Sequence, residues 1–175
     1  MTKDCRAKLP LLLFSGYAVF ITAVTLNRDS WLRTATSVEL LLASMRKVKG
    51  IHPYRHLAHV LLPEHFHWMF TPLDTENFSH IVAAVKREVS WQIKRREMGN
   101  AKLWQPRFYD HLIRNEMDFV RHLDYIHFNP VKHGYATQPA AYAYSSFSEW
   151  VNKGVYTPDW GASGIPLNIQ DLNFE

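Results

Sequence analysis

Two hydrophobic periodicities alternate along this chain of 175 residues and predict its first elements. Short runs rich in aromatic and β-branched side chains are typical of strands, and they span about residues 17–26, 54–62 and 65–71. From about residue 37 to 49, apolar side chains recur every three or four residues, which predicts a helix. Pro63 and Glu64 predict a tight connection between the second and third strands.

A second helix is predicted over about residues 75–98, with Gly99 and Asn100 as its stop signal. Residues 103–112 are predicted to form a short strand or an extended segment. The order is therefore strand, helix, strand, strand, helix, strand. That order is typical of an α+β, ferredoxin-like split βαβ fold, in which helices cover one face of an antiparallel sheet.

A third helix is predicted from Asn115 to the Asn129–Pro130 junction, because proline disfavours helical backbone at the residue before it. After Tyr135, aromatic residues, glycines and prolines predict an irregular extension with one short helix at about 146–151. We expect a single domain over residues 1–175, with a core at about 16–134 and an extension at about 135–175.

Composition narrows the class of protein and its compartment. Hydrophobic residues make up 47% of the chain and aromatic residues 14%, which excludes a disordered protein. The single cysteine, Cys5, excludes an internal disulfide and a cysteine-rich zinc site, and fits a reducing compartment such as the cytoplasm. Residues 9–26 carry no charge and resemble either an export signal or a buried strand. Because Pro10 and the Ser15–Gly16 pair interrupt the run, we favour the strand and expect no membrane contact.

Basic residues gather in one stretch of the chain. The net charge is +4, and eight basic residues against three acidic ones lie between Lys86 and Arg114. This pattern is typical of proteins that bind a polyanion, most often nucleic acid. A solvated helix face is the other interpretation.

His65 and His67 are the first candidates for chemistry. Residues two apart on a strand point to the same side, so both imidazoles share a face if Phe66 points into a core. Two converging neutral imidazoles form half of a metal site. A pair of half-exposed histidines without a metal is the simpler interpretation.

Tyr125 and Asn129 are four residues apart in the predicted third helix and share a helix face. A phenol can act as a nucleophile, and an amide oxygen can ligate a hard cation. A core tyrosine with a hydrogen-bonded hydroxyl is the alternative. His122, one turn before Tyr125, is the local candidate for a proton acceptor.

Three motifs occur in order along the chain. They are Leu-Pro-Glu-His-Phe-His at residues 62–67, Leu-Trp-Gln-Pro-Arg-Phe-Tyr-Asp-His-Leu-Ile-Arg at 103–114 and Asp-Tyr-Ile-His-Phe-Asn-Pro-Val-Lys-His-Gly at 124–134. Together they resemble the REP-associated tyrosine transposases, which are domesticated relatives of the single-tyrosine, His-hydrophobic-His transposases of the insertion-sequence 200/605 type. The resemblance extends from about residue 16 to 160.

The resemblance implies a metal-dependent enzyme that cleaves and rejoins single-stranded DNA beside the hairpin of a repetitive extragenic palindrome. Tyr125 matches the nucleophile, which forms a 5′-phosphotyrosine intermediate. His65 and His67 match the metal-binding pair, and Asn129 matches a third ligand. These ligands suit Mg²⁺ or Mn²⁺, and Zn²⁺ fits the same set.

DNA contacts are expected mainly from basic side chains. They are Lys94, Arg95, Arg96, Lys102, Arg107, Arg114, Lys132 and His133. Trp104, Phe108 and Tyr109 could stack on unpaired bases, with a core position as the favoured alternative. Residues 11–14 are more apolar than in relatives, which leaves only Arg6 and Lys8 for a DNA contact before the first strand.

Two other functions fit parts of the pattern. A hairpin-binding repressor or architectural protein without catalysis would use the same basic residues. A plasmid relaxase or replication initiator shares the histidine pair, but the short chain disfavours it. We expect a monomer, with a dimer as the alternative, that acts at the nucleoid of a bacterium.

Overall fold

The computed structural model describes residues 17–96 and 102–174. Four antiparallel strands form one sheet in the order β2-β3-β1-β4. The strands are β1 (Val19–Val24), β2 (Tyr54–Leu61), β3 (His65–Pro72) and β4 (Tyr109–Leu112). This is the strand order of the split βαβ arrangement, so the predicted fold class is confirmed.

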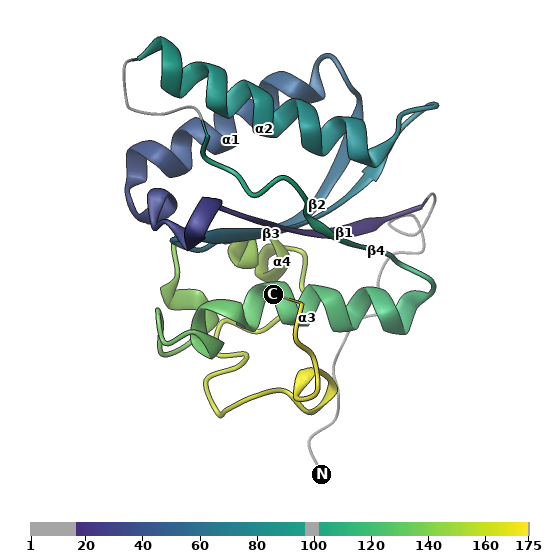
Figure 1. Ribbon diagram of the computed structural model, residues 1–175. Helices are drawn as coiled ribbons and strands as arrows, with labels where there is room; N and C mark the ends of the chain where they lie inside the picture. The colour runs from purple at the N-terminus through teal and green to yellow at the C-terminus, as the bar shows by residue number, and fades with distance from the viewer. Residues whose placement is uncertain (1–16, 97–101, 175) are drawn as a thin grey trace.

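Helices cover both faces of the sheet (Figure 1). The helices α1 (Ala35–Lys49) and α2 (Phe78–Arg95) pack side by side on one face. On the opposite face lie α3 (Glu116–Lys132), α4 (Phe147–Asn152) and the C-terminal segment. The two helices of the core fold thus share one face as expected, and the additional third helix occupies the other.

The central strands β1 and β3 send alternate side chains into two separate cores. Phe66 and Trp68 of β3 pack towards α1 and α2, while Met69 packs in the cluster formed with α3. Because residues two apart on a strand share a face, His65 and His67 point with Met69 towards α3. The periodicity of β3 predicts that the two imidazoles share a face, and the packing of α3 against that face buries them.

The helix α3 does not end at the Asn129–Pro130 junction, so that prediction is wrong. It begins after the capping residue Asn115 and runs to Lys132 with Pro130 inside it. Pro130 has no N–H to donate, but the His133 N–H still bonds the Asn129 carbonyl at 3.0 Å. The turn before Pro130 is buried, and its packing outweighs the local preference of proline.

Local caps explain the other shifts in element boundaries. Thr34 accepts a hydrogen bond from the Ser37 N–H at 3.2 Å, so α1 begins before residue 37. Asn77 accepts from the Ser79 N–H at 2.8 Å, so α2 begins after residue 75. In the predicted 103–112 segment only the last four residues form β4, and Trp104 makes an isolated bridge to Thr25, just after β1.

The extension after α3 packs against α3 and β2. The Trp150 indole donates to the Leu57 carbonyl at 3.0 Å, and the Tyr142 hydroxyl donates to the Leu61 carbonyl at 2.7 Å. These hydrogen bonds attach the extension to β2.

Some sequence-based expectations lie outside the described residues. They concern Cys5, the DNA contacts of Arg6 and Lys8, the apolar residues 11–14 and the helix stop at Gly99 and Asn100. Of the helices that the structure describes, none is long and apolar enough to cross a membrane.

Candidate active site

His65 and His67 lie together on β3, with ring centroids 4.8 Å apart. Both side chains are 0% exposed, because α3 covers this face of the sheet. The pair is therefore not the half-exposed pair of the simpler interpretation. A buried imidazole needs partners for both of its nitrogens.

Thr22 on β1 sets the position of the proton on His67. The two residues face each other across the strand pair, and Thr22 Oγ1 lies 2.8 Å from His67 Nδ1. A hydroxyl has one proton, and Thr22 donates it to the Phe174 carbonyl at 2.8 Å. Thr22 can therefore only accept from His67, which places the imidazole proton on Nδ1 and the lone pair on Nε2.

Glu64 orients His65 in the same way. Glu64 Oε1 lies 3.1 Å from His65 Nδ1, and this hydrogen bond lowers the pKa of the Glu64 carboxyl. An ionised carboxylate only accepts hydrogen bonds, so His65 Nδ1 carries the proton. The Tyr135 hydroxyl donates to the other carboxylate oxygen at 3.3 Å. A carboxylate behind an imidazole is the usual support of a metal-binding histidine.

Three buried groups at this point have no hydrogen-bond partner of good geometry among the described residues. They are Nε2 of His65, Nε2 of His67 and the side-chain amide of Asn129. Leaving a buried polar atom unpaired costs roughly 1–3 kcal/mol, so such a group marks a missing partner. Two imidazole lone pairs and an amide oxygen are ligands for a divalent cation. These side chains fit the predicted metal.

Burial holds the pKa of the His67 imidazole well below its usual range. The nearby His65, His133 and Lys132 lower it further, whereas the amide of Asn129 acts in the opposite direction. His67 is therefore neutral at pH 7, which is the form that binds a metal.

Tyr125 reaches the histidine pair from α3. Its ring centroid lies 5.2 Å from that of His67, and its side chain is 2% exposed. Lys132 Nζ donates to the phenol oxygen at 3.3 Å. Tyr125, Asn129 and Lys132 follow one another at spacings of about one turn, so α3 brings all three to one side only because it continues through Pro130.

The last described residues cover this site. The Phe174 N–H donates to the Tyr125 oxygen at 3.2 Å, and the two ring centroids lie 4.9 Å apart. Asp171 holds the same segment to Arg121 on α3 through bonds of 3.0 and 3.1 Å. Nothing in the local sequence pattern around Phe174 predicts these contacts.

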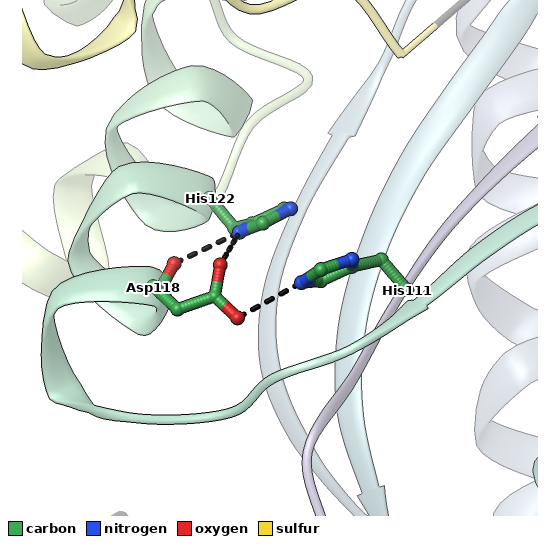
Figure 2. A group of neighbouring side chains, drawn as sticks. All are labelled: His111, Asp118 and His122. Atoms are coloured by element: carbon green, nitrogen blue, oxygen red, sulfur yellow. Dashed lines mark hydrogen bonds and ion pairs between the residues drawn. The ribbon is translucent and has the colours of Figure 1, made fainter.

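A second group of side chains could also hold a metal ion. Among the described residues, ligand atoms of His111, Asp118 and His122 lie within 4.8 Å of one another (Figure 2). Asp118 Oδ2 lies 2.8 Å from His111 Nε2, and Oδ1 lies 3.0 Å from His122 Nδ1. His111 and Asp118 were not among the residues predicted from the sequence, although Asp118 and His122 stand four apart on α3.

Two features of this group favour a hydrogen-bonded triad over a metal centre. The His111 and His122 rings stack at 4.5 Å with 15° between their planes, so their in-plane lone pairs do not converge on one ion. His122 Nδ1 also lies 2.8 Å from the Asp118 carbonyl, which requires a proton on that nitrogen. His122, the predicted proton acceptor for Tyr125, is thus hydrogen-bonded to Asp118. The Tyr125 oxygen instead accepts from Lys132 and from the Phe174 N–H.

The predicted DNA-binding residues fall into three places. Lys132 and His133 lie at the end of α3, where the His133 ring is 5.3 Å from that of His65. A second set ends α2 in the other layer of the molecule: Lys94, Arg95 and Arg96. A third set is exposed on the segments that flank β4: Lys102, Arg107 and Arg114. Only the first set adjoins the site.

The three aromatic candidates for base stacking differ in their surroundings. Trp104 is buried against Trp31 and Phe66, and Phe108 is half-buried against Phe78, so the core interpretation applies to both. Tyr109 is exposed and stacks on Phe174 with centroids 5.5 Å apart.

Known proteins resemble this chain in sequence, although no family model matches it. The chain is 38% identical over 146 residues to a REP-associated tyrosine transposase of Escherichia coli (strain K12), which covers 83% of this chain and 85% of that protein. It is 34% identical over 122 residues to a putative REP-associated tyrosine transposase of Haemophilus influenzae (strain ATCC 51907 / DSM 11121 / KW20 / Rd), which covers 64% of this chain and 69% of that protein.

A solved structure shares the fold over nearly the whole chain. It shows a REP-associated tyrosine transposase bound to a REP hairpin, and it superposes with a TM-score of 0.77 at 34% identity. The match covers 91% of this chain and 90% of that one. Sequence and fold therefore agree on one group of DNA-transposing enzymes, and this chain belongs to the REP-associated tyrosine transposase family.

Proposed function

We propose that this transposase cleaves and rejoins single-stranded DNA beside a hairpin, through a covalent bond between Tyr125 and a 5′-phosphate. The observation that supports this most is the meeting of Tyr125 with the unpartnered groups of His65, His67 and Asn129. The hairpin is inferred from the similar solved transposase, which is bound to one.

The proposed reaction exchanges one phosphate ester for another. The Tyr125 oxygen attacks phosphorus, and its bond forms as the bond from phosphorus to the 3′ oxygen breaks. The phenol loses its proton, and the departing 3′ oxygen gains one to become a hydroxyl. A 3′-hydroxyl of another strand then attacks the phosphotyrosine and releases Tyr125. The number of esters is unchanged, so no ATP is required.

His65, His67 and Asn129 would hold a divalent cation, with Mg²⁺ or Mn²⁺ suited to the mixed nitrogen and oxygen ligands. When bound, such an ion stabilises negative charge on a phosphate. The protein contributes orientation, because Thr22 and Glu64 hold the Nδ1 sides of the two imidazoles. Both Nε2 lone pairs are thereby directed away from β1 and Glu64.

Lys132 would support the nucleophile. A neutral phenol is a weak nucleophile, and it needs a neighbouring group that favours charge on its oxygen. The Lys132 ammonium donates to that oxygen at 3.3 Å, and a close positive charge favours the anion. Because Phe174 covers Tyr125, the C-terminal segment must move before a DNA strand reaches the phenol.

One chain contains all the proposed catalytic groups, so a monomer suffices for the reaction. The basic residues at the ends of α2 and α3 and around β4 would bind the phosphates of the DNA. A chromosomal hairpin as substrate would place the activity at the nucleoid.

Tyr125→Phe tests the proposed nucleophile. The change removes one oxygen and keeps the ring, so it should abolish the covalent protein–DNA adduct while hairpin affinity stays nearly the same. The adduct is measured with a labelled oligonucleotide and Mn²⁺ on a denaturing gel. An adduct that persists in this variant would refute the assignment of Tyr125.

The same gel tests the metal groups. EDTA and His67→Ala should each remove the adduct, whereas His111→Ala should reduce it much less. A larger loss of adduct in His111→Ala than in His67→Ala would assign the metal to the group of His111, Asp118 and His122. Hairpin binding by a wild-type protein that forms no adduct would establish the alternative, a binding protein without catalysis.

A further inference from the structure

The side chain of Trp91 is 47% exposed on the outer surface of α2. This surface belongs to the layer of α1 and α2, on the sheet face opposite Tyr125 and the histidine pair (Figure 1). Arg87, Trp91 and Arg95 are four residues apart and form one stripe along α2. The proposed reaction does not use any of these residues.

Cations surround the indole of Trp91. Lys47 Nζ from α1 and Arg95 Cζ each lie 5.2 Å from the centre of its ring. The nearby acid, Glu88, is engaged by the Lys47 ammonium at 2.8 Å and by Gln92 at 2.9 Å. The surface around Trp91 is therefore positive, and the exposed Lys94 and Arg96 extend it.

A hollow of about 380 Å³ lies beside the indole, between the end of α1 and the middle of α2. Its lining includes Trp91, Ile51, Arg87, Lys47 and the acid Glu88. Ile51 is also exposed, so apolar and charged side chains line the hollow together. An exposed apolar patch with a polar rim is characteristic of a binding site.

We propose that this surface binds single-stranded DNA next to the hairpin, with an unpaired base against Trp91 and phosphates against Arg87 and Arg95. Aromatic side chains that stack on bases, set among cations that follow the backbone, are the general means of binding a single strand. The inference rests on the DNA-binding part of the proposed function and does not require the chemical step. It assigns the α2 surface a DNA contact that is separate from the site of cleavage.

The positive charge of this surface favours DNA over a second copy of the chain as its binding partner. A symmetric contact through this surface would oppose its cations to the same cations of the other copy. A polyanion with planar bases matches both the charge and the indole. A second copy is therefore an outcome of the test and not the proposal.

Fluorescence anisotropy with two DNA probes tests the proposal. One probe is a blunt hairpin, and the other is the same hairpin with a single-stranded arm. Trp91→Ala should weaken binding of the armed hairpin about fivefold or more, since a stacked base contributes roughly 1–3 kcal/mol. The same variant should leave binding of the blunt hairpin unchanged, and Trp91→Phe should keep most of the affinity for the arm.

Two further variants complete the test. Arg87→Ala with Arg95→Ala should lower the salt dependence for the armed probe by about 0.7 log units per log unit of salt for each phosphate that the protein no longer neutralises. Met117→Ala removes an exposed apolar side chain on α3, in the other layer, and should change neither probe. Circular dichroism melts confirm that each variant is folded.

Equal affinity of Trp91→Ala and wild type for the armed hairpin would overturn the proposal. So would a dimer, seen by sedimentation, that forms only when Trp91 is present. Failure of the proposed chemistry is distinguishable, because it appears as a missing adduct on a short oligonucleotide while Trp91→Ala still loses affinity for the arm.

Discussion

At the scale of single residues, protons decide what the histidine pair can bind. Thr22 has one hydroxyl proton, and the Phe174 carbonyl takes it. His67 must then keep its own proton on Nδ1, and Nε2 is left with a lone pair and no partner among the described residues. A threonine that is not itself one of the proposed ligands thereby prepares His67 for the proposed metal.

Thr22→Val should weaken Mn²⁺ binding about 10- to 100-fold, the usual cost of losing a group that orients a metal-binding histidine. Valine keeps the shape of threonine and removes the acceptor for His67 Nδ1. Calorimetric titration with Mn²⁺ measures the affinity without any DNA.

Thr71→Val is a matched control, because Thr71 is also buried on β3 and its hydroxyl has no hydrogen-bond partner among the described residues. This variant should bind Mn²⁺ as the wild type does. An equal loss in the two variants would show that Thr22 acts through packing and not through His67.

At the scale of elements, β2 contains a bulge between His56 and Ala58. Residues three apart on a regular strand point to opposite faces, but the bulge lets His56 and His59 meet. Their Nε2 and Nδ1 atoms are 3.0 Å apart, and the Trp68 indole donates to His56 Nδ1 at 3.0 Å. His56 therefore accepts at Nδ1 and donates from Nε2, so both imidazoles are neutral in the fold.

This pair predicts a loss of stability in mild acid. Burial lowers the pKa of His56 to about 4 and that of His59 to about 3, whereas both titrate near 6.5 in an unfolded chain. Below pH 6.5 the unfolded chain binds more protons than the folded one, so the free energy of unfolding decreases as pH falls. Between pH 7.5 and 5.5, these two residues should together lower the free energy of unfolding by about 3 kcal/mol. Urea unfolding at several pH values measures this change.

His59→Asn removes one of the two groups and should reduce the loss of stability over this pH range by about 1.5 kcal/mol, the share of one histidine. A free energy of unfolding that stays constant from pH 7.5 to 5.5 in the wild type would contradict the predicted protonation states.

At the scale of the whole molecule, the site is completed by parts from both ends of the described chain. Thr22 on β1 bonds Phe174 across 152 positions of sequence. The buried carboxylate of Asp124 holds the extension in place, because it accepts from the Tyr156 hydroxyl and the Asn168 amide at 2.7 Å each. The structure around Tyr125 thus depends on the attachment of the extension to α3.

Asp124→Ala should lower the free energy of unfolding by about 2–4 kcal/mol, because it leaves the buried Tyr156 hydroxyl and the half-buried Asn168 amide without their acceptor. Asp171→Ala removes an exposed carboxylate from the same segment and should cost less than about 1 kcal/mol. Urea unfolding of both variants measures the difference. Equal costs would show that the extension is held mainly by its apolar contacts.

Much of the fold followed from spacing within contiguous segments. The alternation of β3 predicts that His65 and His67 share a face, and four-residue spacing predicts that Tyr125 and Asn129 share another. The end of α3 could not be predicted in this way, because the preference of Pro130 is local and the packing that overrides it comes from distant residues. The family assignment was predicted from three motifs and is confirmed by the comparisons.

The sequence alone determined the order of the elements, the direction of the paired imidazoles and the family, since each depends on neighbours along the chain. Tertiary structure alone decided that the pair is buried, that Thr22 holds the proton of His67 on Nδ1, and that Phe174 covers the phenol. These features depend on residues that are far apart in the sequence: Thr22 bonds His67 across 45 positions and Phe174 across 152. No local pattern carries that information.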